Sequence, residues 1–330
     1  MSETFYILKD VDLKRKDNNV VVRTLDGQEK NLKSERTNEI YLFGETTLNT
    51  KVLNFLSQKQ IIVHVFNYYG FYSGSFYPRE QNISGHLLVN QVRTYDDYER
   101  RLKLAKSILK SASYNIYRNL RYYNGRGTDL KEEMKKIESL RYKLDLKESI
   151  NELMGIEGNI RKAYYSCWNK IVKQDIQFNK RVKRPPDNMI NTLISFINSL
   201  FYTTTLSEIY KTQLDPTISY LHEPGTKRFS LALDLSEIFK PLIVDRMIFS
   251  MLNKNQITEN DFERESNFLY LKEEGKKKIL MEYDKRLERI ISHRDLGRDV
   301  SYRYLIRLEC YKLIKDIIGE DEYTGFEIWW

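Results

Sequence analysis

The chain has 330 residues, of which 41% are hydrophobic and 30% charged, so it can build a buried core and is not a disordered polymer. It contains no run of about 18 apolar residues, which excludes an ordinary membrane-spanning helix. The N-terminus has no basic segment typical of a signal peptide. The two cysteines, Cys167 and Cys310, lack the spacing of a zinc site or a disulfide framework. We therefore expect a cytoplasmic protein that does not associate with membranes.

Positive charge is the first clue to a partner. Lysine and arginine number 54 against 46 aspartates and glutamates, which gives a formal net charge of +8. An excess of this size favours a polyanionic partner, and nucleic acid is the commonest one. Charge alone leaves open a soluble protein that is merely basic.

The first 84 residues predict a small β domain. Short apolar runs bounded by turn residues predict strands at Phe5–Leu8, Val20–Leu25, Glu39–Phe43, Ile61–Phe66 and Phe71–Tyr77. Asp26-Gly27 after the second run is a hairpin signal. One helix is expected at Thr47–Gln58, where apolar residues recur at helical spacing. We expect mostly antiparallel pairing in this domain, which spans residues 1–84.

From residue 85 the apolar period becomes helical. Breaker residues such as Asn124-Gly125 and Pro185-Pro186 separate the helical patterns, and Asp187 is placed to cap the helix that follows the prolines. The expected helices are 86–123, 129–148, 153–176, 188–212, 234–253, 272–292 and 299–317. The predicted fold class is therefore α+β, with the small β domain followed by a larger all-α domain at residues 85–330.

Histidine is scarce, and one histidine stands apart. His222 lies in the sequence Tyr-Leu-His-Glu-Pro-Gly, a predicted loop between two apolar helices. Loops held by rigid helices are common places for chemistry. The other three histidines fit a packed strand, a helix start and a basic surface better than a reactive site.

Two acids follow this loop on one predicted helix. Asp234 and Glu237 are three residues apart, so they share a helical face, and their neighbours are apolar. Burying unpaired carboxylates is costly, and a divalent cation would remove that cost. An acidic first turn stabilised by the helix dipole is the simpler alternative.

Glu157 is a third acidic candidate. It lies between Gly155 and Gly158 at the start of an apolar helical pattern, and glycine beside a carboxylate allows a backbone or a ligand to come close. A first-turn glutamate without a ligand is again the alternative. Carboxylates combined with one imidazole suit Mg²⁺ or Mn²⁺.

Several stretches resemble the CRISPR adaptation integrase, the first CRISPR-associated protein, which inserts new spacers. The stretches are GIEGNIRKAYY (155–165), LDPTISYLHEPG (214–225), FSLALDLSEIFKPLIVDR (229–246), IYLFGETTLN (40–49) and YYGFYSGSFYPRE (68–80). The resemblance covers essentially the whole chain. The three C-terminal motifs in this order and spacing are specific, whereas the two N-terminal ones are weak alone.

The resemblance assigns roles to individual residues. It implies that Glu157, His222 and Glu237 bind the metal; many family members have aspartate at the last position, so metal position and preference could differ slightly here. It implies that Asp234 supports the site and that Lys240 contacts a phosphate. It also implies a homodimer with N-terminal dimerisation, in complex with the small ferredoxin-like second CRISPR adaptation protein.

The implied activity is metal-dependent DNA endonuclease and integrase chemistry in adaptive antiviral defence. A spacer 3′-hydroxyl attacks a phosphodiester at the leader–repeat border of the CRISPR array, and with water as the nucleophile the same site is a nuclease. The double-stranded DNA partners are the protospacer and the leader–repeat. Basic residues expected to contact DNA phosphates are Arg181, Lys183, Arg184, Arg298 and Arg303.

Two other functions remain open at this point. A non-catalytic DNA-binding scaffold of the same complex would use the acidic residues only to fold the loop. An enzyme acting on small phosphate esters is the third possibility, and the basic charge disfavours it.

Overall fold

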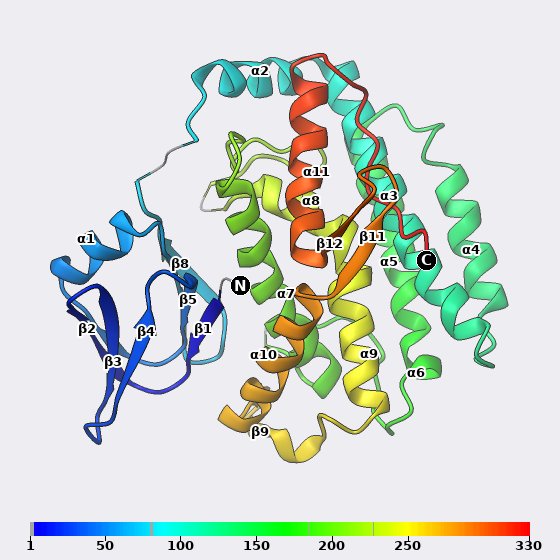
Figure 1. Ribbon diagram of the computed structural model, residues 1–330. Helices are drawn as coiled ribbons and strands as arrows, with labels where there is room; N and C mark the ends of the chain where they lie inside the picture. Colours follow the sequence, from blue (N-terminus) through cyan, green and yellow to red (C-terminus); the bar gives the residue numbers. More distant parts are fainter. Residues whose placement is uncertain (1–2, 80–81, 184, 227) are drawn as a thin grey trace. The chain divides into compact units, whose positions relative to one another are not determined.

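The computed structural model describes residues 3–79, 82–183, 185–226 and 228–330, and the chain separates into two compact units, Met1–Gln81 and Asn82–Trp330 (Figure 1). The first unit is rich in strands and the second is mostly helical, which confirms the predicted fold class. In the described residues, we find no helix with the length and apolar character needed to cross a bilayer.

The N-terminal unit is built from two four-stranded sheets and one helix. Its elements are β1 (Glu3–Ile7), β2 (Val11–Lys16), β3 (Asn19–Thr24), β4 (Glu29–Lys33), β5 (Thr37–Leu42), β6 (Thr46–Thr47), α1 (Thr50–Gln58), β7 (Ile62–Phe66) and β8 (Tyr72–Phe76). Valine, leucine and isoleucine side chains of both sheets pack with Phe55 and Leu56 of α1 into one core. Alternation of apolar and polar residues in the strands produces this one-sided burial.

The pairing of these strands is mixed rather than mostly antiparallel. In the sheet β1-β5-β7-β8, the first two pairings are parallel and the last is antiparallel. In the sheet β4-β3-β2-β6, the first two pairings are antiparallel and the last is parallel. The predicted hairpin at Asp26-Gly27 is confirmed, with Gly27 at φ +84° between β3 and β4. Parallel neighbours are distant in sequence, so local turn signals do not reveal them.

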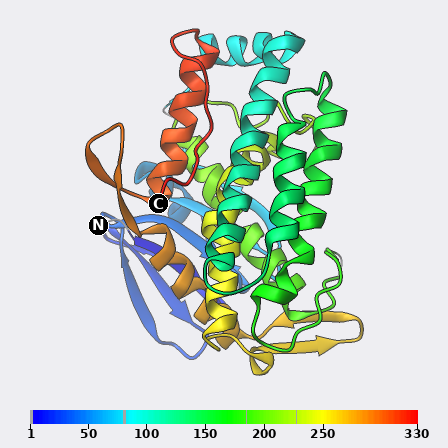
Figure 2. The same cartoon turned by 90° about the vertical axis from the view of Figure 1, so that its right-hand side faces the viewer.

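The C-terminal unit is a helical assembly with two small hairpins. Its helices are α2 (Gly85–Asp96), α3 (Tyr98–Asn124), α4 (Lys131–Tyr142), α5 (Ile150–Ser166), α6 (Trp168–Ile171), α7 (Met189–Tyr210), α8 (Ser230–Lys240), α9 (Arg246–Asn253), α10 (Glu273–Leu287) and α11 (Tyr302–Ile317). Helices α3, α4 and α5 pack against one another and lie side by side in Figure 2.

Two helix predictions are corrected. The expected helix 86–123 is two helices, because Asp97 leaves the helical conformation and its side chain accepts a hydrogen bond from the Arg100 amide at 3.1 Å. The cap of α7 is Asn188 rather than Asp187, since its side-chain oxygen accepts from the Asn191 amide at 2.9 Å. Asp187 instead accepts from the Asn191 side chain at 2.7 Å.

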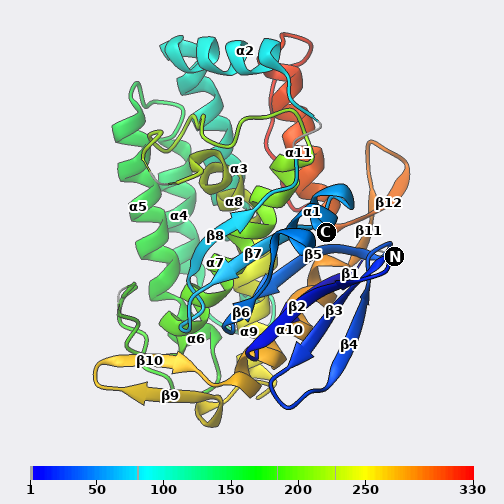
Figure 3. The same cartoon turned by 90° about the vertical axis from the view of Figure 1, so that its left-hand side faces the viewer.

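The second unit is also not purely α-helical. Strands β9 (Phe262–Glu265) and β10 (Phe268–Leu271) form one antiparallel hairpin, visible in Figure 3, and β11 (Ile290–His293) and β12 (Arg298–Ser301) form another. Strand β11 replaces the end of the expected helix 272–292 and β12 the start of the expected helix 299–317, whereas β9 and β10 lie in a stretch for which no element was predicted.

A π-helical turn joins α8 to α9 at Pro241–Asp245, and the whole turn is buried. Proline cannot donate a backbone hydrogen bond, so the regular α-helical ladder is interrupted there. Two buried asparagine side chains of α3 donate hydrogen bonds to backbone carbonyls at and just before this turn. Asn115 donates to the Ile238 carbonyl at 2.9 Å, and Asn119 donates to the Pro241 carbonyl at 2.8 Å. These bonds fix α8, which carries two of the candidate acids, against α3.

Candidate active site

Asp234 organises the loop that carries His222. Its carboxylate is fully buried in the middle of α8. One oxygen accepts the Tyr220 and Leu221 amides at 2.7 and 2.9 Å, and the other accepts the His222 amide at 2.9 Å. The His222 ring nitrogen Nδ1 lies 2.8 Å from that second oxygen. Both oxygens of Asp234 are therefore occupied by the loop, and the carboxylate sets the orientation of the imidazole.

Glu157 and Glu237 meet at Arg161. Glu157 of α5 accepts a hydrogen bond from Arg161 Nε at 3.0 Å, one helical turn away on the same face. The other end of the same guanidinium contacts Glu237 Oε2 of α8. Two acids from separate helices are thus held at one place by one cation.

Lys240 and Asp245 complete the charged cluster. Lys240 Nζ lies 2.6 Å from Glu237 Oε1, and burial lowers the Lys240 pKa to about 7. Burial raises the pKa of the Asp245 carboxyl to about 6, against the effect of Arg161 and of a hydrogen bond from Tyr164. Burial alone would lower the pKa of Arg161, but Tyr165, Glu157 and Asp245 raise it overall. Acids and bases here depend on one another for charge compensation.

The expected three metal ligands are only partly brought together. Glu157 is joined to Glu237 through Arg161, and His222 is joined to Asp234. Within residues 3–79, 82–183, 185–226 and 228–330, no group of three His, Cys, Asp or Glu side chains is arranged closely enough to hold a metal ion.

The donor chemistry nevertheless suits a divalent cation. Two carboxylates converge on a single cationic group, and a metal ion could take over contacts that Arg161 now makes. The imidazole of His222 has Nδ1 fixed on Asp234, which leaves Nε2 as the nitrogen available for coordination. His222 is bonded to a residue one helical turn from Glu237, so the imidazole and the acids belong to the same region.

The basic residues expected at DNA differ in how the fold uses them. The Arg181 guanidinium donates to the Asn191 and Ser195 side chains, so it anchors the loop before α7. Lys183 is exposed, although partial desolvation of its amine lowers its pKa. The Arg303 guanidinium nitrogen Nη1 lies 3.8 Å from Oε1 of the buried Glu208 carboxylate.

Of the remaining two candidates for DNA contact, only Arg298 lies in the described part of the chain. Arg298 is exposed and donates to the Tyr304 hydroxyl at 3.3 Å, which leaves it accessible to a phosphate. Arg184 lies outside the described residues.

Sequence reasoning overlooked the roles of Arg161 and Asp245. The spacing of four residues between Glu157 and Arg161 was a readable signal, because such pairs share a helical face. Asp245 had no comparable signal, since its burial depends on the π turn. The glycines flanking Glu157 have nothing within 4 Å of the place where a Cβ would lie, so no neighbouring backbone packs against them.

Comparison with known proteins assigns the chain to a family. The chain matches the model of CRISPR associated protein Cas1 over residues 5–285. The chain belongs to the Cas1 family. The resemblance inferred from the sequence motifs is therefore confirmed.

Two curated relatives extend along the full length of this Cas1 chain. The CRISPR-associated endonuclease Cas1 of Fusobacterium nucleatum is 56% identical over 330 residues, covering 100% of this chain and 98% of the relative. The CRISPR-associated endonuclease Cas1 of Clostridium perfringens is 50% identical over 333 residues, covering 100% of both.

Solved structures share the Cas1 fold. A CAS1 protein from Thermotoga maritima aligns with a TM-score of 0.88 at 40% identity and covers 98% of this chain and 100% of its own. A casposase bound to an integration product aligns with the same TM-score at 23% identity, covering 98% of this chain and 93% of its own. The casposase comparison shows the fold alone.

Proposed function

We propose that this Cas1-family chain is a metal-dependent DNA endonuclease and integrase that inserts spacer DNA into a CRISPR array. The observation that carries the proposal is the convergence of Glu157 and Glu237 on Arg161, together with a histidine held by Asp234 one helical turn from Glu237. Relatives at 50% and 56% identity bear the name endonuclease, which supports the same reaction class.

Glu157, Glu237 and His222 would hold the ion, which we propose to be Mg²⁺ or Mn²⁺. When bound, the ion supplies charge stabilisation at the phosphate and activates the attacking hydroxyl. Asp234 positions His222 and does not itself offer a free oxygen. Lys240 lies beside Glu237 and, in its protonated form, would contact a phosphate oxygen.

We propose double-stranded protospacer and leader–repeat DNA as the substrates. The net charge of +8 supports this, because phosphate contacts by basic side chains dominate DNA affinity. A solved Cas6-RT-Cas1--Cas2 complex shares the fold at a TM-score of 0.84 and 18% identity. We further propose a homodimer that works in the cytoplasm with the small second adaptation protein.

Strand transfer tests the proposal directly. A short duplex is incubated with a supercoiled CRISPR plasmid, this chain and the small partner, with Mn²⁺ or with a chelator. Products are expected with Mn²⁺ only, and Glu157→Gln should abolish them. Glu138→Gln, at an exposed site on α4, removes the same charge elsewhere and should leave the yield unchanged.

Three outcomes would contradict the proposal. Products that survive chelation would refute the metal mechanism. Full activity of Glu157→Gln would refute the site. No products under any condition, with DNA binding retained, would favour the non-catalytic scaffold.

A further inference from the structure

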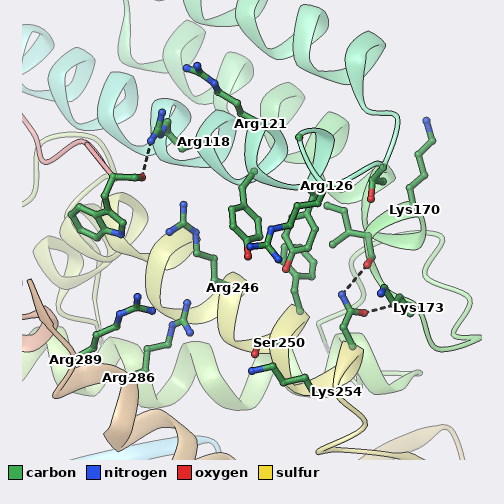
Figure 4. A pocket seen from close by; sticks show the side chains of 18 residues that line it. Arg118, Arg121, Arg126, Lys170, Lys173, Arg246, Ser250, Lys254, Arg286 and Arg289 are labelled. Carbon is green, nitrogen blue, oxygen red and sulfur yellow. Dashed lines mark hydrogen bonds between the residues drawn. The ribbon is translucent and has the colours of Figure 1, made fainter.

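A large basic cavity opens in the C-terminal unit, away from the acidic cluster. Its volume is about 1200 Å³, and it shares none of its lining residues with the small cavity at Glu157 and Glu237. Nine arginine and lysine side chains line it, with no aspartate or glutamate among its described lining residues. They come from α3, α6, α9 and α10 and from the residues that directly follow each of these helices (Figure 4).

Some of these cations have structural bonds. Arg118 donates to the Trp330 carbonyl at 2.6 Å, Arg246 to the Asn119 side chain at 2.6 Å, and Arg286 to the Leu242 carbonyl at 3.0 Å. The Asn119 and Leu242 acceptors are neutral, so these two bonds fix the walls without neutralising the charge of Arg246 and Arg286. Burial, with smaller contributions from Arg246 and Arg289, lowers the pKa of Arg286 to about 10. Like charges here are close enough to affect one another.

Other cations of the basic cavity make no such structural bonds. Arg126 and Lys254 are exposed, and within the described residues their side chains make no hydrogen bond or ion pair with the protein. Among the nine, Lys170 alone pairs with an acid in that part of the chain, namely Glu133 at 2.6 Å. Folding does not require such an uncompensated concentration of charge, so a polyanionic ligand is the natural source of compensation.

Aromatic rings add a second kind of contact. Tyr122 is 46% exposed, and the guanidinium of Arg126 lies 4.4 Å from its ring centroid. The Arg246 guanidinium lies 6.0 Å from the centroid of the same ring, and Figure 4 labels both arginines among the side chains that line the cavity. Aromatic rings next to arginine form platforms on which unpaired nucleic-acid bases stack.

The size of the cavity favours a ligand larger than a single drug-sized molecule. Pockets for a single drug-sized molecule measure about 300–1,000 Å³, so this one is larger than such a ligand needs. A duplex would present its backbone but keep its bases paired and out of reach of Tyr122. A flexible single strand can place both phosphates and bases in the same hollow.

We propose that the basic cavity binds a segment of single-stranded DNA at a site separate from the acidic cluster. Lys254 and Arg126 contact phosphates, and Tyr122 stacks on a base. Binding at this site does not require the catalysis proposed above, because no residue of the acidic cluster takes part in it.

The test measures affinity of the full chain for a labelled 12-nucleotide thymidine strand by fluorescence anisotropy, with chelator present so that no reaction occurs. Each lost phosphate contact lowers affinity about fivefold near 0.1 M salt and makes the salt dependence less steep by ~0.7 per contact. The double variant Arg126→Gln/Lys254→Gln should therefore bind about 25-fold more weakly. The matched double variant Lys136→Gln/Lys315→Gln removes the same charge at exposed sites outside the cavity and should change affinity less than twofold.

Tyr122 separates stacking from charge. Tyr122→Ala should weaken strand binding about tenfold, whereas Tyr122→Phe keeps the ring and should bind as the parent does. Equal affinities of the two double variants would overturn the proposal. So would a loss confined to duplex DNA, or a loss confined to inorganic tripolyphosphate, because the site would then hold a different ligand.

Discussion

Asp234→Asn is the most direct test of how the histidine loop is held. The carboxylate accepts four contacts, three from backbone amides and one from His222 Nδ1. In asparagine, one oxygen becomes an amino group that can only donate. If the amino group replaces the oxygen that faces Tyr220 and Leu221, two buried amides lose their acceptor. If it replaces the other oxygen, the His222 amide loses its acceptor, whereas the imidazole can change tautomer and accept.

The magnitude follows from the one or two donors that lose their acceptor. Each buried donor left unsatisfied costs about 1–3 kcal/mol, so the variant should lose about 1–6 kcal/mol of unfolding free energy. That is a large part of a typical total of about 5–15 kcal/mol. An acid that served only the helix dipole would contribute about 0.3–1 kcal/mol. Asp234 is already beyond the first turn of α8, so the larger loss is expected.

Urea denaturation followed by far-UV circular dichroism gives this free energy. Asp295→Asn is the matched control, because Asp295 is exposed in the loop between β11 and β12. Surface changes of that kind stay within about 0.5 kcal/mol. A loss below 0.5 kcal/mol for Asp234→Asn would show that the four contacts do not hold the loop.

Three further predictions follow from single features. His222→Ala should abolish strand transfer while duplex binding and the melting temperature stay near the parental values; integration at the parental rate would exclude His222 from the site. Gly44→Ala should destabilise the protein by at least ~1–3 kcal/mol in urea titrations, because its Cβ would collide with the Lys9 backbone, whereas Gly74→Ala meets nothing within 4 Å and serves as the control. Burial raises the pKa of Cys167 to about 12 and that of Cys310 well above its usual value, so neither thiol should react with a disulfide reagent at pH 8 until urea is added; a fast-reacting native thiol would contradict this.

The sequence was informative where one physical period dominates. Alternation and turn residues placed β3, β5, β7 and β8, and helical periodicity placed most of the C-terminal helices. Strands rich in charged residues were not predicted, such as β4 with the sequence EKNLK and β9 with FERE, because few of their side chains are buried and no apolar pattern marks them. The Asp17-Asn18 turn between β2 and β3 was a missed signal, since Asp17 has a positive φ of 52°.

The candidate site divides in the same way. Motif resemblance selected Glu157, His222 and Glu237, and helical spacing alone could have added Arg161. The basic cavity could not be foreseen, because its cations are spread from residue 118 to residue 289 and meet only after α3, α9 and α10 have packed. Clusters assembled from distant helices leave no local pattern.

The last residues of the chain are tied to the helix that carries the acids. Asn115 donates at once to the Ile238 carbonyl of α8 and to the Phe326 carbonyl, and its oxygen accepts the Ile328 amide at 2.8 Å. Phe326 also stacks on Phe239 of α8, with ring centroids 5.0 Å apart. A purification tag or reporter fused directly after Trp330 would therefore pull on the segment that braces α8. Such fusions need a flexible spacer, and their activities should be compared with those of the untagged chain before any substitution is interpreted.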